Sequence, residues 1–249
     1  MHRFEELAYE QTPMGELTLR RRHEPAAEID VFEVKLGEEF LMSSLFTVAE
    51  EALSDLGLAA IAADRRELDV LVGGLGLGYT AVAALQDQRV RTLTVVDALS
   101  AVIDWHKTRL LPVSDSLMDD PRTALVHADF FALMRAAPDQ AHAQSLADVP
   151  ARFDAILLDV DHSPTFTLDP SHADLYTVEG LRRLMVHLAP GGVFGLWSDD
   201  PPEEGFLDAL RCVFGRVEGH TVAFDNPLTG GVSRNGVYVA VAPQPDGGS

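Results

Sequence analysis

The stretch Leu68-Asp-Val-Leu-Val-Gly-Gly-Leu-Gly-Leu-Gly-Tyr79 decides the fold of this chain. Its apolar residues 70–72 predict a strand, and the residues that follow Tyr79 are typical of a helix. The turn between them contains four glycines: Gly73, Gly74, Gly76 and Gly78. A strand, a glycine-rich turn and a helix in this order open a nucleotide-binding α/β unit, because glycine lets a ligand approach the backbone closely. The N–H groups of the helix N-terminus then face that ligand.

The glycine spacing separates two classes of nucleotide-binding protein. A dinucleotide fingerprint, G-x-G-x-x-G, that starts at Gly74 would need a glycine where Tyr79 stands, so that pattern fails. Gly74, Gly76 and Gly78 instead form G-x-G-x-G, a spacing closer to that of enzymes that bind nucleoside sulfonium compounds than to that of NAD enzymes. A purely structural glycine-rich turn is the alternative.

Length, charge and cysteine content limit the class of protein. The 249 residues, of which 47% are hydrophobic, suffice for one large domain, or for one domain and a small one. The net charge of -20 argues against nucleic acid as a partner, since a phosphate-binding face must be basic. It is compatible with a cationic substrate such as a polyamine, although an acidic surface can serve solubility alone. The single cysteine, Cys212, predicts a reducing, cytoplasmic location, and we expect no signal peptide and no membrane-spanning segment.

Two regions of the chain differ in their residue pattern. Residues 1–66 predict a small N-terminal β domain, in which 15–20 and 29–36 are strands, with a connecting helix over 44–63. Residues 67–242 alternate strand and helix patterns, which implies a mostly parallel sheet with helices on both faces, and the tail over 243–249 is expected to be disordered. The predicted strands of the second region are 70–72, 92–96, 124–127, 155–158, 193–197, 221–224 and 237–241, and its helices are 80–86, 101–110, 178–188 and 203–213.

Carboxylates follow two of these strands, at the edge where open α/β sheets bind ligands. Asp97 comes about twenty residues after the glycine turn, where an acid can accept both hydroxyls of an adenosine ribose. Asp129 follows the next strand. It is expected either to contact the adenine amine or to cap the helix that begins at Phe130.

A polar cluster follows the buried strand over 155–158. It contains Asp159, Asp161 and His162. A carboxylate at this edge can accept a proton from an attacking amine, or hold the amine by charge-assisted hydrogen bonds. Asp-x-Asp-His could also bind a metal ion, but the sequence offers no clear set of further ligands, so we expect none.

Four other side chains invite a functional interpretation. The helix after Asp97 could bring Trp105 or His106 to the rim of the pocket, although core packing is the expectation for Trp105. His127, within a strand, is expected to be a core histidine. Cys212 is expected to pack on a helix face, since nothing pairs it with a base.

The order of these motifs resembles that of the spermidine synthase (polyamine aminopropyltransferase) family over about residues 12–197. The turn at 73–78 is similar to the family's Gly-Gly-Gly-Asp-Gly-Gly turn, and Asp97 and Asp129 match its ribose and adenine contacts. Asp159-Val-Asp-His-Ser-Pro164 resembles the Asp-Ser-x-Asp-Pro loop that carries the catalytic aspartate. The segments Leu175-Tyr-Thr-Val-Glu179 and Leu188-Ala-Pro-Gly-Gly192 resemble the helix and turn that follow.

The resemblance implies an α/β, Rossmann-like class I methyltransferase fold with a small N-terminal β domain. It implies a transferase of polyamine biosynthesis that takes S-adenosylmethionine or its decarboxylated form as co-substrate and a small-molecule amine as acceptor, with no nucleic-acid or membrane partner. A homodimer is one option for the assembly. The implied residue roles are catalysis for Asp159 and Asp161, nucleoside binding for Gly73, Gly74, Gly76, Gly78, Asp97 and Asp129, and acceptor binding for Asp161, His162 and Glu50.

Several positions bear on which member of this superfamily the chain resembles. Val72 is apolar, as in aminopropyltransferases, where ordinary methyltransferases carry an acid. The departures lie in the amine half of the site: the family's amine-holding aspartate falls on Leu77, its second loop aspartate near His162, and its glutamine beside the thioether near Met42. The N-terminal Tyr-His-Glu motif is reduced to Val48-Ala-Glu50. Since losing a carboxylate partner for a buried ammonium costs several kcal/mol, the identities of donor and acceptor are open.

Three functional hypotheses follow. The first is an aminopropyltransferase-like enzyme in which an amine attacks the carbon beside the sulfonium and Asp159 orients and deprotonates that amine. The second is an S-adenosylmethionine-dependent methyltransferase, which Leu77 favours. The third is a non-catalytic, nucleoside-binding member of the fold, against which Asp97, Asp129 and Asp159 argue.

Overall fold

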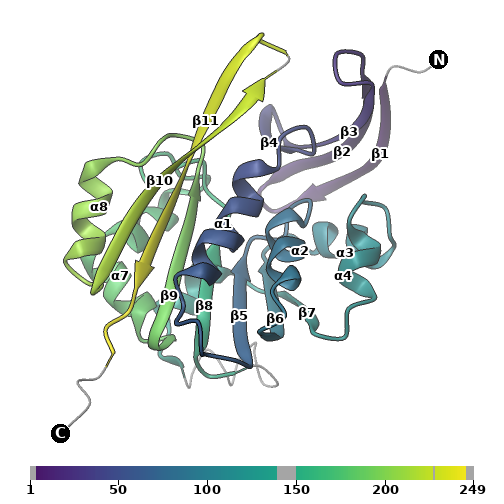
Figure 1. Ribbon diagram of the computed structural model, residues 1–249. Coiled ribbons are helices and arrows are strands. Elements are labelled where there is room, and N and C mark those ends of the chain that lie inside the picture. Colours follow the sequence, from purple (N-terminus) through teal and green to yellow (C-terminus); the bar gives the residue numbers. More distant parts are fainter. Residues whose placement is uncertain (1–3, 139–149, 227, 245–249) are drawn as a thin grey trace, which may run out of the picture.

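The computed structural model describes residues 4–138, 150–226 and 228–244 of the chain. Within these ranges the strands form two sheets, one of four strands and one of seven (Figure 1). The four-stranded sheet is antiparallel, in the order β1-β2-β3-β4, and is built entirely from the N-terminal region. Its strands are β1 (Phe4–Thr12), β2 (Gly15–Glu24), β3 (Ile29–Leu36) and β4 (Glu39–Ser43).

The seven-stranded sheet has the order β10-β11-β9-β8-β5-β6-β7. Strands β5 to β9 are parallel, and the hairpin β10–β11 joins antiparallel to β9 at one edge. The mostly parallel sheet and the separate small N-terminal sheet confirm the predicted fold class. The strands are β5 (Leu68–Gly73), β6 (Val90–Asp97), β7 (Thr123–His127), β8 (Phe153–Leu158), β9 (Leu188–Ser198), β10 (Arg216–Asn226) and β11 (Gly231–Val241).

Helices cover both faces of this sheet, because successive side chains of a buried strand point to opposite sides. On β5, Val70 and Val72 belong to one apolar cluster, with residues of α1 to α4, whereas Leu71 belongs to a second cluster, with residues of α5, α7 and α8. The helices are α1 (Val48–Ala59), α2 (Tyr79–Gln86), α3 (Ser100–Lys107), α4 (Ser114–Met118), α5 (Phe130–Arg135), α7 (Val178–Met185) and α8 (Glu204–Arg211), and a 3-10 helix, η1, spans Pro170–Tyr176.

Some element boundaries differ from the sequence-based expectation. The helix predicted over 44–63 is shorter, because Ser44 still pairs with Phe32 of β3: the backbone N–H of Ser44 donates to the carbonyl oxygen of Phe32 at 2.9 Å. Strands β1 and β4 were not predicted. The last two strands are much longer than predicted, since each pairs along the whole hairpin.

Three isolated side chains can now be placed. Trp105 is buried in the core, as predicted. His127 is not a core residue: it is exposed at the edge strand β7, where its Nε2 lies 3.1 Å from the carbonyl oxygen of Ala98. Cys212 is also exposed, one residue beyond the end of α8, so the predicted packing on a helix face is wrong.

Two further expectations concern the C-terminal tail and membrane-spanning helices. Most of the tail predicted to be disordered, 245–249, lies outside the described residues. Among the helices that are described, none is long and apolar enough to cross a membrane.

Candidate active site

The glycine turn between β5 and α2 requires glycine at three positions for backbone reasons. Gly74, Gly76 and Gly78 have φ of 93°, 48° and 92°, in the left-handed region that other residues rarely adopt. A β-carbon on Gly74 would lie 2.0 Å from the carbonyl oxygen of Asp159, so the turn packs directly against the end of β8. The turn is thereby held next to the carboxylate that the sequence singled out for catalysis.

Asp97, at the end of β6, lies against the same turn. Its carboxylate accepts hydrogen bonds from the backbone N–H of Leu75 at 2.9 Å and of Leu99 at 2.7 Å. Burial raises the pKa of Asp97, and these N–H donors oppose that rise. Asp97 therefore orders the loop that the sequence assigned to the nucleoside, and its contact with a ribose stays a prediction.

Asp129 caps a helix. Its Oδ1 accepts a hydrogen bond from the backbone N–H of Ala132 at 3.0 Å, at the N-terminus of α5. The residue is exposed and stands outside the lining of the cavity described next. The capping role is confirmed, and the adenine contact stays a prediction.

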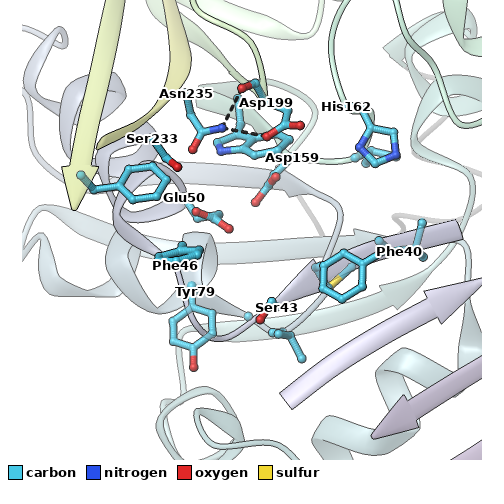
Figure 2. Close-up of a pocket in the computed structure, with 18 of the residues that line it drawn as sticks. Phe40, Ser43, Phe46, Glu50, Tyr79, Asp159, His162, Asp199, Ser233 and Asn235 are labelled. Carbon is cyan, nitrogen blue, oxygen red and sulfur yellow. Dashed lines mark hydrogen bonds between the residues drawn. The ribbon is translucent and has the colours of Figure 1, made fainter. Parts of the chain in front are cut away.

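A cavity of about 370 Å³ lies at the carboxyl edge of the sheet, bounded by β4, the start of α1, the glycine turn, the loop after β8, the end of β9 and the β10–β11 hairpin (Figure 2). Both sheets contribute to it, so the N-terminal region completes the site. Its acidic lining residues are Glu50, Asp159 and Asp199, and its aromatic lining residues are Phe40, Phe46, Tyr79, Trp197 and Phe224.

Two carboxyl groups in the cavity have perturbed pKa values. Burial raises the pKa of Asp159 to about 6, although its Oδ2 accepts a hydrogen bond from the Thr80 hydroxyl at 2.6 Å. Burial, and next the charge of Asp159, raise the pKa of Glu50 to about 8. Each carboxyl group therefore keeps its proton to a higher pH than usual, and a cation that enters the cavity favours its loss. Perturbed carboxyl groups in a cleft are typical of a functional site.

Asp161 is placed differently from its predicted role. It is 1% exposed, and its carboxylate accepts hydrogen bonds from the backbone N–H of Leu168 at 2.8 Å and from the Tyr176 hydroxyl at 2.6 Å. His172 Nδ1 lies 2.8 Å from the same carboxylate. Asp161 does not line the cavity. The structure thus uses it to order the loop after β8, two residues beyond Asp159.

His162 does reach the cavity. Its Nε2 lies 3.1 Å from Oε1 of Glu39 on β4, and its ring stacks on Phe166 with 4.9 Å between ring centroids. The backbone N–H of Asp199 also donates to the carbonyl oxygen of His162 at 2.7 Å. The loop after β8 is thus tied to both the N-terminal sheet and the end of β9.

The departures from the resembling family gather at this cavity. Met42, Glu50, Leu77 and His162 all line it. Leu77 is 4% exposed, and a β-carbon on Gly76 would lie 2.7 Å from Sδ of Met42. The structure therefore concentrates these sequence differences in the lining of one cavity.

Asp199 and Asn235 were not identified from the sequence. Nδ2 of Asn235 donates to Oδ1 of Asp199 at 2.9 Å and to its carbonyl oxygen at 2.8 Å, as Figure 2 shows. Asp199 follows strand β9 at the ligand-binding edge, the same signal that pointed to Asp97 and Asp159, so the sequence could have revealed it. No sequence signal indicates Asn235, because the hairpin brings it to the site from the antiparallel edge of the sheet.

Among the described residues, no group of three or more His, Cys, Asp and Glu side chains is arranged to hold a metal ion. The three carboxyl groups of the described cavity lining, beside a single arginine, Arg234, suit an organic cation. Carboxylates can pair with an ammonium group, and aromatic faces attract it through their quadrupoles.

Comparisons with known proteins agree with the motif-based resemblance. No protein-family model matches the chain. Curated polyamine aminopropyltransferases of Mycobacterium tuberculosis and Mycobacterium bovis are 30% identical over 132 residues, which are 53% of this chain and 23% of those relatives. The chain thus matches less than a quarter of the length of these relatives.

Solved structures extend the similarity to the fold. A spermidine synthase in complex with the transition-state analogue AdoDATO matches with a TM-score of 0.69 at 18% identity, over 95% of this chain and 73% of that one. Spermidine synthase from Thermotoga maritima gives 0.67 at 17% identity, over 95% and 72% of the two chains. A probable spermidine synthase from Corynebacterium glutamicum gives 0.60 at 17% identity, over 95% and 79%. The chain has the spermidine synthase fold, and over half of its length its sequence is similar to that of polyamine aminopropyltransferases.

Proposed function

We propose that this protein is an aminopropyltransferase, which transfers an aminopropyl group from decarboxylated S-adenosylmethionine to a small-molecule amine. The observation that carries the proposal is the pair of perturbed carboxyl groups, Glu50 and Asp159, in a cavity beside the glycine turn. The similarity to polyamine aminopropyltransferases supports it.

The nucleoside half of the proposed site is the turn at 73–78 with Asp97 and Asp129. Asp97 would accept the ribose hydroxyls, and Asp129 would contact the adenine amine beside its capping role. Gly76 and Gly78 line the cavity, so a nucleoside on the turn would direct its sulfonium group toward Asp159.

The proposed reaction is an in-line displacement at carbon. The acceptor nitrogen forms a bond to the methylene carbon next to the sulfonium as the carbon–sulfur bond breaks, and methylthioadenosine leaves as a neutral thioether. Asp159 accepts the proton that the nitrogen loses. Because the sulfonium is already a good leaving group, alignment and charge placement supply most of the acceleration. Asp161 contributes by ordering the loop that carries Asp159 and His162.

Glu50 and Asp199 would hold the positive charges that this reaction brings into the cavity. Both line it, and the charge of Asp199 contributes to the raised pKa of Glu50. Entry of an ammonium group would relieve this repulsion between carboxylates. The substitution of Leu77 for the family's amine-holding aspartate leaves Glu50 and Asp199 as the carboxylates available besides Asp159.

Methyl transfer from S-adenosylmethionine is the second candidate. The observation that favours it is the buried Leu77 in the cavity wall, where the resembling family has an aspartate that recognises the aminopropyl amine. Without that carboxylate, the decarboxylated donor loses part of its advantage over the ordinary one.

One experiment compares these candidates. Calorimetry with decarboxylated S-adenosylmethionine, S-adenosylmethionine and methylthioadenosine measures the nucleoside preference, and mass spectrometry of reactions with a panel of amines measures the group transferred. We expect methylthioadenosine as the product together with an acceptor that gains an aminopropyl group. A methylated acceptor would establish the second candidate. Nucleoside binding without transfer to any amine would favour a non-catalytic role.

The cellular location and the oligomeric state of the protein are also proposals. The single cysteine suits a reducing cytoplasm, and a homodimer is the assembly that we propose to test by light scattering.

A further inference from the structure

His106 is a buried histidine that the proposed reaction does not use. It lies on α3, is 0% exposed, and reaches the glycine turn: its Nε2 is 3.0 Å from the carbonyl oxygen of Gly76. Its other ring nitrogen, Nδ1, is 3.3 Å from Oγ of Ser114. Both ring nitrogens therefore have a partner, one of them within the proposed nucleoside loop.

These contacts define the state of the ring. A carbonyl oxygen only accepts hydrogen bonds, so Nε2 must carry a hydrogen. In the neutral imidazole Nδ1 then accepts from the Ser114 hydroxyl. Burial lowers the pKa of His106, which favours this neutral form.

The carbonyl that His106 holds belongs to a peptide with unusual freedom. Gly76 has a φ of 48°, and Gly76 and Leu77 lie in a turn between Gly74 and Gly78. In a planar trans peptide the C=O and the following N–H point in opposite directions. Since His106 fixes the Gly76 carbonyl, it also directs the N–H of Leu77 away from α3. Gly76 and Leu77 both line the cavity.

Two side chains thus hold the turn from different elements. Asp97, from β6, accepts from the N–H of Leu75, and His106, from α3, donates to the carbonyl of Gly76. The backbone also closes the turn, since the N–H of Gly78 donates to the carbonyl oxygen of Leu75 at 2.8 Å. Neither of these contacts holds the carbonyl of Gly76, and His106 supplies that contact.

We propose that His106 is a positioning residue that, as a neutral imidazole held by Ser114, sets the orientation of the Gly76–Leu77 peptide for nucleoside binding. The nucleoside part of this inference rests on the proposed function. The restraint on the turn does not, so the two can be tested separately.

The test combines amide hydrogen exchange with calorimetry. His106→Leu removes the donor, and His106→Gln supplies an amide N–H at a similar reach. Exchange of the backbone amides over 75–79, followed by NMR, reports the order of the turn without any ligand. Affinity for methylthioadenosine reports its consequence. His187→Leu is the matched control, because His187 is also a buried histidine whose Nε2 lies 3.1 Å from a backbone carbonyl oxygen, that of Ala136, but it precedes β9 at the edge of the sheet opposite the glycine turn.

We expect His106→Leu to accelerate exchange in the turn and to weaken methylthioadenosine binding by about tenfold or more, because the loosened turn must then be ordered when the nucleoside binds. His106→Gln should restore most of the protection from exchange and most of the affinity, and His187→Leu should change neither. If His106→Leu leaves exchange in the turn unaltered, the positioning role is wrong. Altered exchange with parental affinity, or a Gln variant as weak as the Leu variant, also overturns the proposal.

The experiment also gives an answer if the variant does not fold or if the parent protein does not bind the nucleoside. If His106→Leu does not fold, Ser114→Ala replaces it: faster exchange over 75–79 and weaker binding support the proposal, and parental values for both overturn it. If the parent protein does not bind methylthioadenosine, the proposed function fails and the nucleoside role of His106 fails with it, whereas the exchange data still decide whether His106 orders the turn.

Discussion

Glu50 and Asp159 face the same cavity, and the charge of Asp159 adds to burial in raising the pKa of Glu50 to about 8. The first residue comes from the helix that follows the N-terminal sheet, and the second from the end of β8. Two carboxyl groups that cannot both ionise easily form a site that gains from an incoming cation. The predictions below test this relationship and the nucleoside site beside it.

Asp159→Asn should lower turnover by roughly a hundredfold or more while it changes methylthioadenosine affinity little, because it removes the proton acceptor and keeps the shape of the side chain. Initial rates with the active donor and acceptor, and calorimetry, measure the two effects. Asp200→Asn is the control, since it removes the same charge from an exposed residue outside the cavity lining. Parental turnover in Asp159→Asn would exclude Asp159 as the base.

Glu50→Gln should remove a pH-dependent loss of stability. Because the pKa of Glu50 is raised to about 8 from a usual value of 4.5, its stabilising contribution is present below pH 4.5 and is lost as the pH rises through about 8. At pH 9 the variant should exceed the parent in free energy of unfolding by roughly 2 to 4 kcal/mol, and at pH 5 the two should be nearly equal. Urea unfolding between pH 5 and 9 measures this. If the free energies of unfolding of the variant and the parent differ by the same amount across that range, the raised pKa of Glu50 is wrong.

Gly76→Ala should weaken nucleoside binding and leave the protein folded. A β-carbon there would lie 2.7 Å from Sδ of Met42, in a turn whose backbone has a φ of 48°. Gly37→Ala is the matched control: its φ is 57°, but among the described residues no heavy atom outside its neighbours would lie within 4 Å of the new β-carbon. Both variants should lose about 1 kcal/mol of stability through backbone strain. Equal methylthioadenosine affinity in both would mean that the turn is purely structural.

Asp97→Ala should weaken methylthioadenosine binding by more than about 1.5 kcal/mol, the loss expected for charge-assisted hydrogen bonds to the ribose. Calorimetry with methylthioadenosine and with its 2′-deoxy analogue separates the ribose contact from the ordering of the turn by Asp97. If the parent and the variant discriminate equally between the two nucleosides, the ribose assignment is wrong.

Substitutions at Asp129 should separate its two roles. Asp129→Ala removes the cap of α5 and should cost about 1 kcal/mol of stability, whereas serine is also a good cap, so Asp129→Ser should retain most of it. If Asp129 contacts the adenine amine, both variants should bind methylthioadenosine more weakly. Parental affinity in both would leave Asp129 with the capping role alone.

The sequence predicted all seven strands of the large sheet in their chain order, because the buried strands and the glycine turn carry local signals. Val70, Leu71 and Val72 form a continuous apolar run, since both faces of β5 are covered. Strand β1 carries no such signal: its residues are exposed or half-buried, so their pattern does not reveal a strand. The prediction that His127 is a core residue was wrong for a similar reason. Strand β7 is at the edge of the sheet, where no further strand pairs with it, and His127 is exposed there.

The sequence by itself determined that the glycine turn, Asp97 and Asp159 gather at one edge of the sheet, since each stands directly at a strand end and the carboxyl ends of parallel strands meet at one edge. Only the tertiary structure decided which carboxylates share the cavity. Asp161, two residues from Asp159, is drawn away by Tyr176, Leu168 and His172, and distant Glu50 takes a place in the cavity with Asp159. Chain position sets which strand end a residue occupies. The direction of its side chain depends on hydrogen-bond partners and packing from elements far away in the sequence, and those exist only once both sheets have formed.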